Sequence, residues 1–152
     1  MRKSLVLAAV LAACTVSFPV SALADGAPRL KSEAEKSPRP ADQALRDAMT
    51  ALRELLAAQV ADGGVEKLSD DEHVALADEI DRRVAAVVAG RDFHSREGRH
   101  LQWMLGDISD GADLMRTAPR AQAKRLGLLR VVETLNYYGR EYDHPGWTPL
   151  HP

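Results

Sequence analysis

Four side chains have the types and spacing that could bind a metal ion: His94, Glu97, His100 and His144. In the run His94-x-x-Glu97-x-x-His100, steps of three residues place the side chains across about 120° of a helix. Imidazole nitrogen and carboxylate oxygen together suit a divalent transition metal such as zinc or copper. If the helices alternate in direction, the end of the last helix brings His144 to the same place. The pattern therefore predicts a metal site at one end of the protein.

The alternative interpretation of these four residues is structural. His94 and His100 would then be solvated residues near a helix start, and His144 would cap a turn. Catalysis finds no support, because no serine, histidine and acid occur in a recognisable local frame and the single cysteine, Cys14, lies in a predicted export signal. We expect no enzymatic activity.

Two further residues stand out against the pattern of their helices. His73 lies on the apolar stripe of its predicted helix but in the first turn, which predicts a partly buried histidine at the far end of the protein rather than a ligand. Trp103 lies about 145° from the centre of its helix stripe and would face water on a bare bundle. It predicts a surface that meets a protein partner or a second copy in a weak homodimer, unless the tail or the leader covers it.

The N-terminal 24 residues have the features of a cleavable secretory signal peptide. Arg2 and Lys3 precede an apolar run, and Ala22-Leu23-Ala24 offers a cleavage site. The run is shorter than the ~20 residues that a membrane span needs. We therefore expect export to the periplasm after cleavage at Ala24. The alternative is a lipoprotein, in which Cys14 of the run Leu11-Ala12-Ala13-Cys14 becomes the lipid-modified N-terminus.

The charge balance and composition narrow the class of protein further. The chain has 20 Lys and Arg against 22 Asp and Glu, which argues against binding to nucleic acid or to anionic lipid. Only seven residues are aromatic, two Phe, two Trp and three Tyr, so the core is expected to be mainly aliphatic. We expect residues 25–39 to form a flexible leader and residues 40–152 to form one domain.

Four stretches with apolar residues at steps of three and four predict four helices. The clearest is Ser69–Gly90, where Ser69 and Glu72 form a capping box and Gly90 ends the helix. We expect Ser37 or the stretch 38–40 to open the first helix, which ends at Asp62-Gly63-Gly64. Ser95 is predicted to cap the third helix, in which Gly98, Gly106 and Gly111 would each cost up to ~1 kcal/mol, and Thr117 with Pro119 is predicted to open the fourth.

These periodicities also predict which residues face inward. They are Leu45, Met49, Leu52, Leu56 and Val60; His73, Leu76, Ala77, Ile80, Val84, Val87 and Val88; Glu97, Leu101, Met104, Leu105, Ile108, Ala112 and Met115; and Leu128, Val131, Leu135, Tyr138 and Tyr142. Short loops join the helices, so we predict an all-α, antiparallel up-down-up-down four-helix bundle with an extended C-terminal tail.

The C-terminal part of the chain resembles a family of small exported proteobacterial proteins. The resemblance rests on Gly111-Ala112-Asp113-Leu114-Met115 and on the run from Val131 to Trp147, of which Tyr-Gly and Asp-His-Pro-Gly-Trp are the most specific parts. It covers the chain from the third predicted helix onward. It implies a helical periplasmic protein and brings no established activity and no functional residues.

Overall fold

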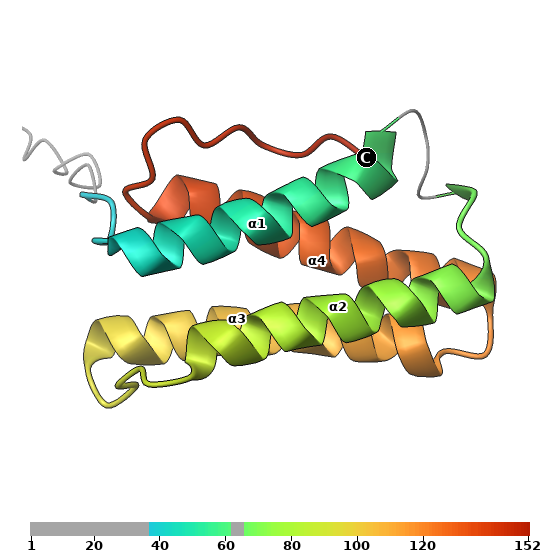
Figure 1. Ribbon diagram of the computed structural model, residues 1–152, viewed down its shortest axis with the longest axis horizontal. Helices are drawn as coiled ribbons and strands as arrows, with labels where there is room; N and C mark the ends of the chain where they lie inside the picture. The colour runs from blue at the N-terminus through green and yellow to red at the C-terminus, as the bar shows by residue number, and fades with distance from the viewer. Residues whose placement is uncertain (1–36, 62–65) are drawn as a thin grey trace, which may run out of the picture. The chain divides into compact units, whose positions relative to one another are not determined.

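Four helices follow one another in the structure, a computed structural model that describes residues 37–61 and 66–152. They are α1 (Gln43–Val60), α2 (Asp70–Val88), α3 (Arg96–Thr117) and α4 (Ala121–Glu141) (Figure 1). Within these two ranges there is no β-strand, only an isolated bridge between Arg39 and Tyr142. The all-α prediction is confirmed. The predicted signal peptide, the leader up to residue 36 and the stop at residues 62–64 lie outside the described residues.

Two of the predicted helix starts are confirmed by their caps. The Ser69 hydroxyl accepts a hydrogen bond from the Glu72 amide, and the Glu72 carboxylate accepts one from the Ser69 amide at 2.7 Å. Gly90 follows α2 with φ +76°, a conformation that glycine adopts readily. Ser95 caps α3 by accepting a hydrogen bond from the Gly98 amide at 2.9 Å.

The other two predicted starts are wrong by a few residues. The cap of α1 is Asp42, whose carboxylate accepts the Leu45 amide at 2.7 Å, so neither Ser37 nor residues 38–40 open this helix. Thr117 is the last residue of α3 rather than the cap of α4, and its hydroxyl donates to the Asp113 carbonyl oxygen at 2.7 Å. This back-bonding is an alternative to capping that threonine has near a helix end.

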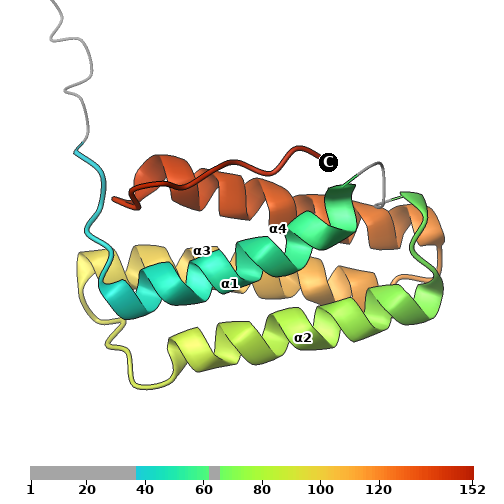
Figure 2. The same ribbon diagram turned by 45° about the horizontal axis from the view of Figure 1, so that its top comes forward.

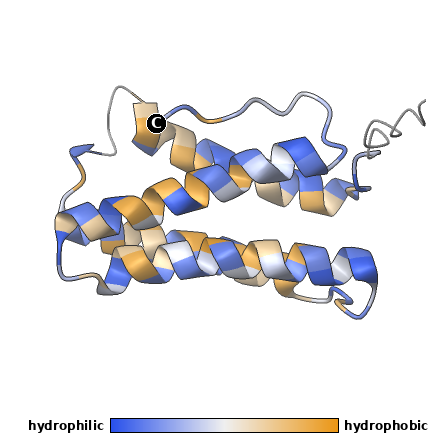
Figure 3. Cartoon of the chain, turned by 180° about the vertical axis from the view of Figure 1, so that it is seen from behind, coloured by the Kyte–Doolittle hydropathy of each residue, from blue (hydrophilic) through white to orange (hydrophobic). Residues whose placement is uncertain are grey.

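The predicted apolar stripes form the core. Each helix is amphipathic, and hydrophilic and hydrophobic residues alternate along it (Figure 3). The stripe of α1 is buried in full, as are the aliphatic stripe of α3 and that of α4. Two inward predictions are wrong: Val88 is 41% exposed, and Glu97 is exposed in the first turn of α3. Both stand near a helix end, where less of the protein lies beside the stripe.

α3 and α4 approach each other closely at two glycines. A Cβ atom on Gly127 would lie 2.6 Å from the Gly111 carbonyl oxygen, and one on Gly111 would lie 2.6 Å from a methyl carbon of Val131. Gly111 was expected to weaken α3, but here its missing side chain lets two backbones touch. Toward the other end of this helix pair, His100 in the first turns of α3 contacts Tyr137 in the last turns of α4, which is where the candidate site lies.

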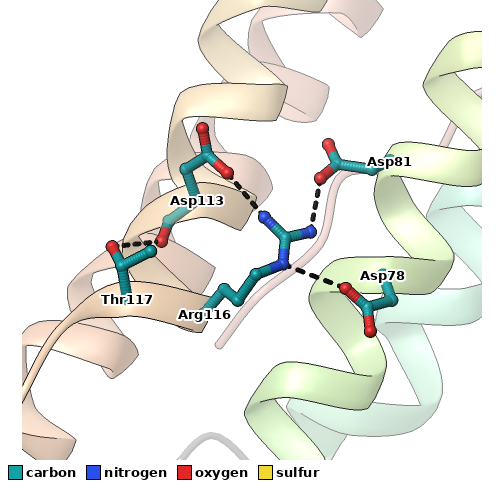
Figure 4. A network of polar contacts seen from close by, with 5 residues as sticks. All are labelled: Asp78, Asp81, Asp113, Arg116 and Thr117. Carbon is teal, nitrogen blue, oxygen red and sulfur yellow. Dashed lines mark hydrogen bonds and ion pairs between the residues drawn. The ribbon is translucent and has the colours of Figure 1, made fainter.

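Arg116 joins α2 to α3 (Figure 4). Its guanidinium group donates to Asp81 at 2.6 Å and Asp78 at 3.0 Å on α2, and to Asp113 at 2.5 Å on α3. Hydrogen bonds to Asp81 and Asp78 raise the pKa of Arg116. Because the network is exposed to solvent, we expect it to orient the two helices more than to stabilise them.

Candidate functional site

The structure does not gather the four predicted metal ligands around one point. His94 precedes α3 and is exposed, as is Glu97. Both ring nitrogens of His100 and of His144 already have hydroxyl partners. Within residues 37–61 and 66–152, no three His, Cys, Asp or Glu side chains form a group that could hold a metal ion. The zinc or copper site therefore stays a prediction to which the geometry adds no support.

His100 and His144 make separate contacts because they reach different tyrosines. Nδ1 of His100 lies 3.1 Å from the Tyr142 hydroxyl, and its Nε2 lies 3.1 Å from the Tyr137 hydroxyl. Nδ1 of His144 lies 2.9 Å from the Tyr138 hydroxyl, and its Nε2 lies 3.3 Å from the Thr50 hydroxyl. Sequence reasoning placed both histidines at the same end of the protein. It could not tell that adjacent tyrosines of α4 would pair with different histidines.

These pairs are part of an aromatic cluster that contains every tyrosine and tryptophan of the chain. Its members are His100, Trp103, Tyr137, Tyr138, Tyr142, His144 and Trp147. Tyr138 and Tyr142 stack at its centre, with ring centroids 4.9 Å apart. Burial raises the pKa of Tyr138, and it raises that of Tyr142 to about 12, so both hydroxyls keep their protons at neutral pH.

Trp103 lies at the exposed margin of the aromatic cluster. Its side chain is 59% exposed, although its ring meets the edge of Tyr137 at 5.9 Å between centroids and lies 5.9 Å from the His100 ring. The Arg140 guanidinium stands 5.8 Å from the centre of the Tyr137 ring on α4. We call Trp103, Tyr137 and Arg140, together with Glu133, the Trp103 face. They border a shallow cleft of about 270 Å³.

The charged groups beneath this cleft are already paired. Asp107 accepts hydrogen bonds from Arg130 at 2.5 Å and from the Thr134 hydroxyl at 2.5 Å. Burial alone would raise the pKa of Asp107, but these hydrogen bonds outweigh it and hold the pKa below its usual range. Glu133 and Arg140 are exposed, and neither makes an ion pair within the described residues. They are therefore available to an incoming molecule.

The tail does not cover Trp103, which removes one of the two explanations offered for its position. Trp147 packs instead against Tyr138, with ring centroids 5.0 Å apart, and against Gly139. The leader, the other proposed cover, lies outside the described residues up to residue 36. Trp103 is thus an exposed aromatic residue on a helix whose opposite face is buried in the core.

His73 is a core residue, as the sequence predicted, although it is more fully buried than expected. Its side chain is 2% exposed. Nδ1 lies 2.9 Å from the Ser69 carbonyl oxygen, so this nitrogen carries the proton and donates it. Nε2 is buried and has no hydrogen-bond partner among the described residues.

A larger cleft lies elsewhere, between the first half of α1, the end of α2 and the start of α3. It has a volume of about 610 Å³ and a lining made largely of small apolar residues. At its edge Arg91 bonds both carboxylate oxygens of Asp42, at 2.9 and 3.0 Å. The Arg91 hydrogen bond holds the pKa of Asp42 below its usual range. This cleft offers volume, and the Asp42 and Arg91 side chains at its edge are paired with each other.

No protein-family model, no curated protein and no solved structure matches this chain. The described helices include none with the length and apolar character that crossing a membrane requires. The most distinctive exposed feature of the described residues is the Trp103 face.

Proposed function

We propose that the protein is an exported, non-catalytic module that binds another protein through the Trp103 face. The observation that supports this most is the 59% exposure of Trp103 beside Tyr137 and Arg140. Trp, Tyr and Arg are the residue types that contribute most to binding energy at protein interfaces. A single exposed aromatic residue is common on proteins, but Trp103 and Arg140 both packed against Tyr137 are a more specific sign.

The Trp103 face also meets a second requirement of a binding surface, which is order before the partner arrives. The edge contact with Tyr137 and the ring contact with His100 restrict the Trp103 side chain. His100 is itself bonded to two tyrosine hydroxyls. Binding then costs less conformational entropy than it would for a mobile side chain. Glu133 and Arg140 add one charge of each sign at the rim of the cleft, which favours a partner with a mixed rather than a single-sign surface.

The zinc or copper alternative has no comparable support. To bind a metal ion, His100 and His144 would have to give up their hydrogen bonds to tyrosine hydroxyls. The third predicted histidine ligand, His94, lies before the start of α3. Export rests on the signal-like N-terminal 24 residues and is part of the proposal. The expectation of no catalysis rests on the sequence, in which no serine, histidine and acid occur in a recognisable local frame, and is part of the proposal.

A photo-crosslinking experiment in the cells that make the protein tests the proposal. The crosslinker p-benzoylphenylalanine is placed at position 106, because a Cβ atom at exposed Gly106 would meet nothing within 4 Å and this position lies one turn beyond Trp103 on α3. The control position is Leu126, a 56% exposed residue of α4. We expect one defined protein adduct from position 106, none from position 126, and loss of the adduct when Trp103→Ser is added. Equal adducts from both positions, or an adduct that survives Trp103→Ser, would contradict the proposal.

A further inference from the structure

The C-terminal strap, residues 143–152, turns back at the end of α4 and lies along α1 and α4 (Figures 1 and 2). Side chains of these helices hold its main chain. Arg53 on α1 donates to the Thr148 carbonyl oxygen. The Asn136 carboxamide on α4 donates to the Leu150 carbonyl oxygen at 2.9 Å and accepts the Leu150 amide at 2.8 Å. Asn136 thus satisfies both polar groups of one residue, as a neighbouring β-strand would. These bonds would form with any extended segment.

Two side chains of the strap supply its apolar contacts. The Trp147 ring lies directly on Gly139, where any larger residue would collide with it, and 5.0 Å from the Tyr138 ring. Leu150, three residues later, is only 4% exposed. We call Arg53, Asn136, Tyr138 and Gly139 the strap site. It accepts an aromatic ring and, three residues on, an aliphatic side chain.

Trp147 is an imperfect occupant of this site. Its indole nitrogen is buried and has no hydrogen-bond acceptor within the described residues. A buried donor without an acceptor loses its bond to water and gains nothing in return, which counts against the docked state. A phenylalanine ring at this position would keep the contact with Gly139 and Tyr138 and carry no such donor.

The strap can also leave without unfolding α4. Asp143, Pro145, Gly146, Thr148 and Pro149 are exposed. The residue before the strap, Tyr142, keeps its own hydrogen bond to His100, and the Arg39 amide keeps its bond to the Glu141 carbonyl oxygen. Release breaks the contacts at the strap site, the bonds of His144 with Tyr138 and Thr50, and the bonds of Asp143 with Arg39 and Arg46. None of these is a hydrogen bond within a helix.

We propose that the strap site is a docking site for an extended segment of another protein, with phenylalanine followed three residues later by an aliphatic residue, and that the strap is its displaceable internal occupant. The recognition mode is main-chain bonding for affinity with two side-chain sites for specificity. A tethered strap competes at an effective concentration in the millimolar range. A partner must therefore bind more tightly than the strap does. A phenylalanine ring gives it that advantage, because it makes the same ring contacts without burying an unpaired N–H donor. This inference is independent of the Trp103 face.

The test is a peptide titration of the full ¹⁵N-labelled chain, followed by nuclear magnetic resonance. The probe is a peptide of residues 144–152 carrying Trp147→Phe. We expect the Trp147 indole signal of the protein to move to its released position as the peptide is added. The Trp103 indole signal should stay in place and serves as the internal control. The same peptide with tryptophan retained should need roughly tenfold more material, which corresponds to one unpaired buried donor.

Two matched controls make the outcome decisive. A peptide with serine at both the aromatic and the aliphatic position should leave the Trp147 signal unchanged. In the full chain carrying Trp147→Ser, which weakens the strap, the phenylalanine peptide should bind more tightly than to the parent, and adding Asn136→Ala should remove that binding. Failure of the phenylalanine peptide to move the Trp147 signal at millimolar concentration, or equal displacement by the serine peptide, would overturn the proposal.

Discussion

The two tryptophans of the chain each have a glycine close by, and the two glycines do opposite things. Gly139 lies directly beneath Trp147, so that the ring occupies the space of a side chain. Gly106 lies one turn from Trp103 on α3 and has nothing within 4 Å of where its Cβ would be. Trp147 is therefore held by the shape of the backbone beneath it, whereas Trp103 is 59% exposed and held by the rings beside it.

This difference separates a residue that stabilises the protein from one that is free to bind. Packing at Trp147 joins the strap to α4, so its loss should appear as lost stability. Contacts at Trp103 are limited to ring edges, so its loss should appear mainly as lost binding.

The largest effect is expected from Gly139→Ala. The added methyl group would collide with the Trp147 ring and displace the strap, which removes the burial of one large aromatic side chain. We expect the free energy of unfolding to fall by about 2 kcal/mol, as measured by urea denaturation. The matched background is Trp147→Ala, where the collision is absent. There Gly139→Ala should be neutral or slightly stabilising, because alanine is the better helix former, and an unchanged cost in that background would show that the strap is not the cause.

A smaller effect is expected from acid. Burial lowers the pKa of His144, and the Arg46 guanidinium lowers it further, while Asp47 and Asp143 act in the opposite direction. His144 borders an open cleft of about 430 Å³, so protons have access to it. A histidine whose folded pKa is depressed stabilises the folded state above its unfolded pKa of ~6.5, and this contribution is lost as pH falls through the folded pKa.

Strap docking should therefore weaken as the pH falls from 7.5 to 5. The measurement is hydrogen exchange at the Leu150 amide, which bonds Asn136. His144→Gln should reduce the pH dependence, whereas His151→Gln, on an exposed residue of the same strap, should leave it unchanged. Equal pH dependence in the parent and in His144→Gln would assign the effect to another group.

Local pattern was enough to predict most of the fold. Helix stripes such as Leu45 to Val60 repeat with the period of a helix, and the capping box at Ser69 involves residues only three apart. Both depend on neighbours in the sequence. The sequence does not single out Asp42 as the cap of α1, because Pro38 and Pro40 just before it are also residues that favour a helix start. Thr117 was misplaced because threonine bonds either forward as a cap or backward to a carbonyl group, and the sequence does not distinguish the two.

The candidate sites depended on contacts between distant residues, which the pattern does not contain. Gly111 looked like a weakness in α3 because nothing in the sequence showed that Gly127 would meet it. His100 and His144 were placed at the correct end of the protein, but their partners depend on which tyrosine of α4 each one reaches. The exposure of Trp103 was predictable from its position on the helix. The sequence could not show that the strap leaves the Trp103 face uncovered, because the tail has no apolar periodicity from which its path could be predicted.

Gly106→Ala should increase stability by up to about 1 kcal/mol. Alanine loses less backbone entropy than glycine in a helix, and the added methyl group meets open space. The comparison is Gly111→Ala on the same helix, where the added group would lie 2.6 Å from Val131 and should destabilise the protein. Thermal unfolding of the two variants beside the parent should show a higher melting temperature for Gly106→Ala and a lower one for Gly111→Ala. Destabilisation by both would mean that α3 needs glycine for its own conformation rather than for space.

The smallest effect on stability is expected from Trp103→Ser. Serine and tryptophan have similar helix propensities, so the helix itself is unaffected. What is lost is the edge contact with Tyr137 and the contact with the His100 ring, and such ring pairs contribute about 0.5–1.5 kcal/mol each at most when buried. Because Trp103 is mostly exposed, we expect a cost in unfolding free energy at or below ~0.5 kcal/mol, measured by urea denaturation beside Leu126→Ser, which removes a similarly exposed residue of α4. A cost of several kcal/mol would instead place Trp103 with Trp147 as a packing residue, and the surface proposed for partner binding would lose the residue on which it depends.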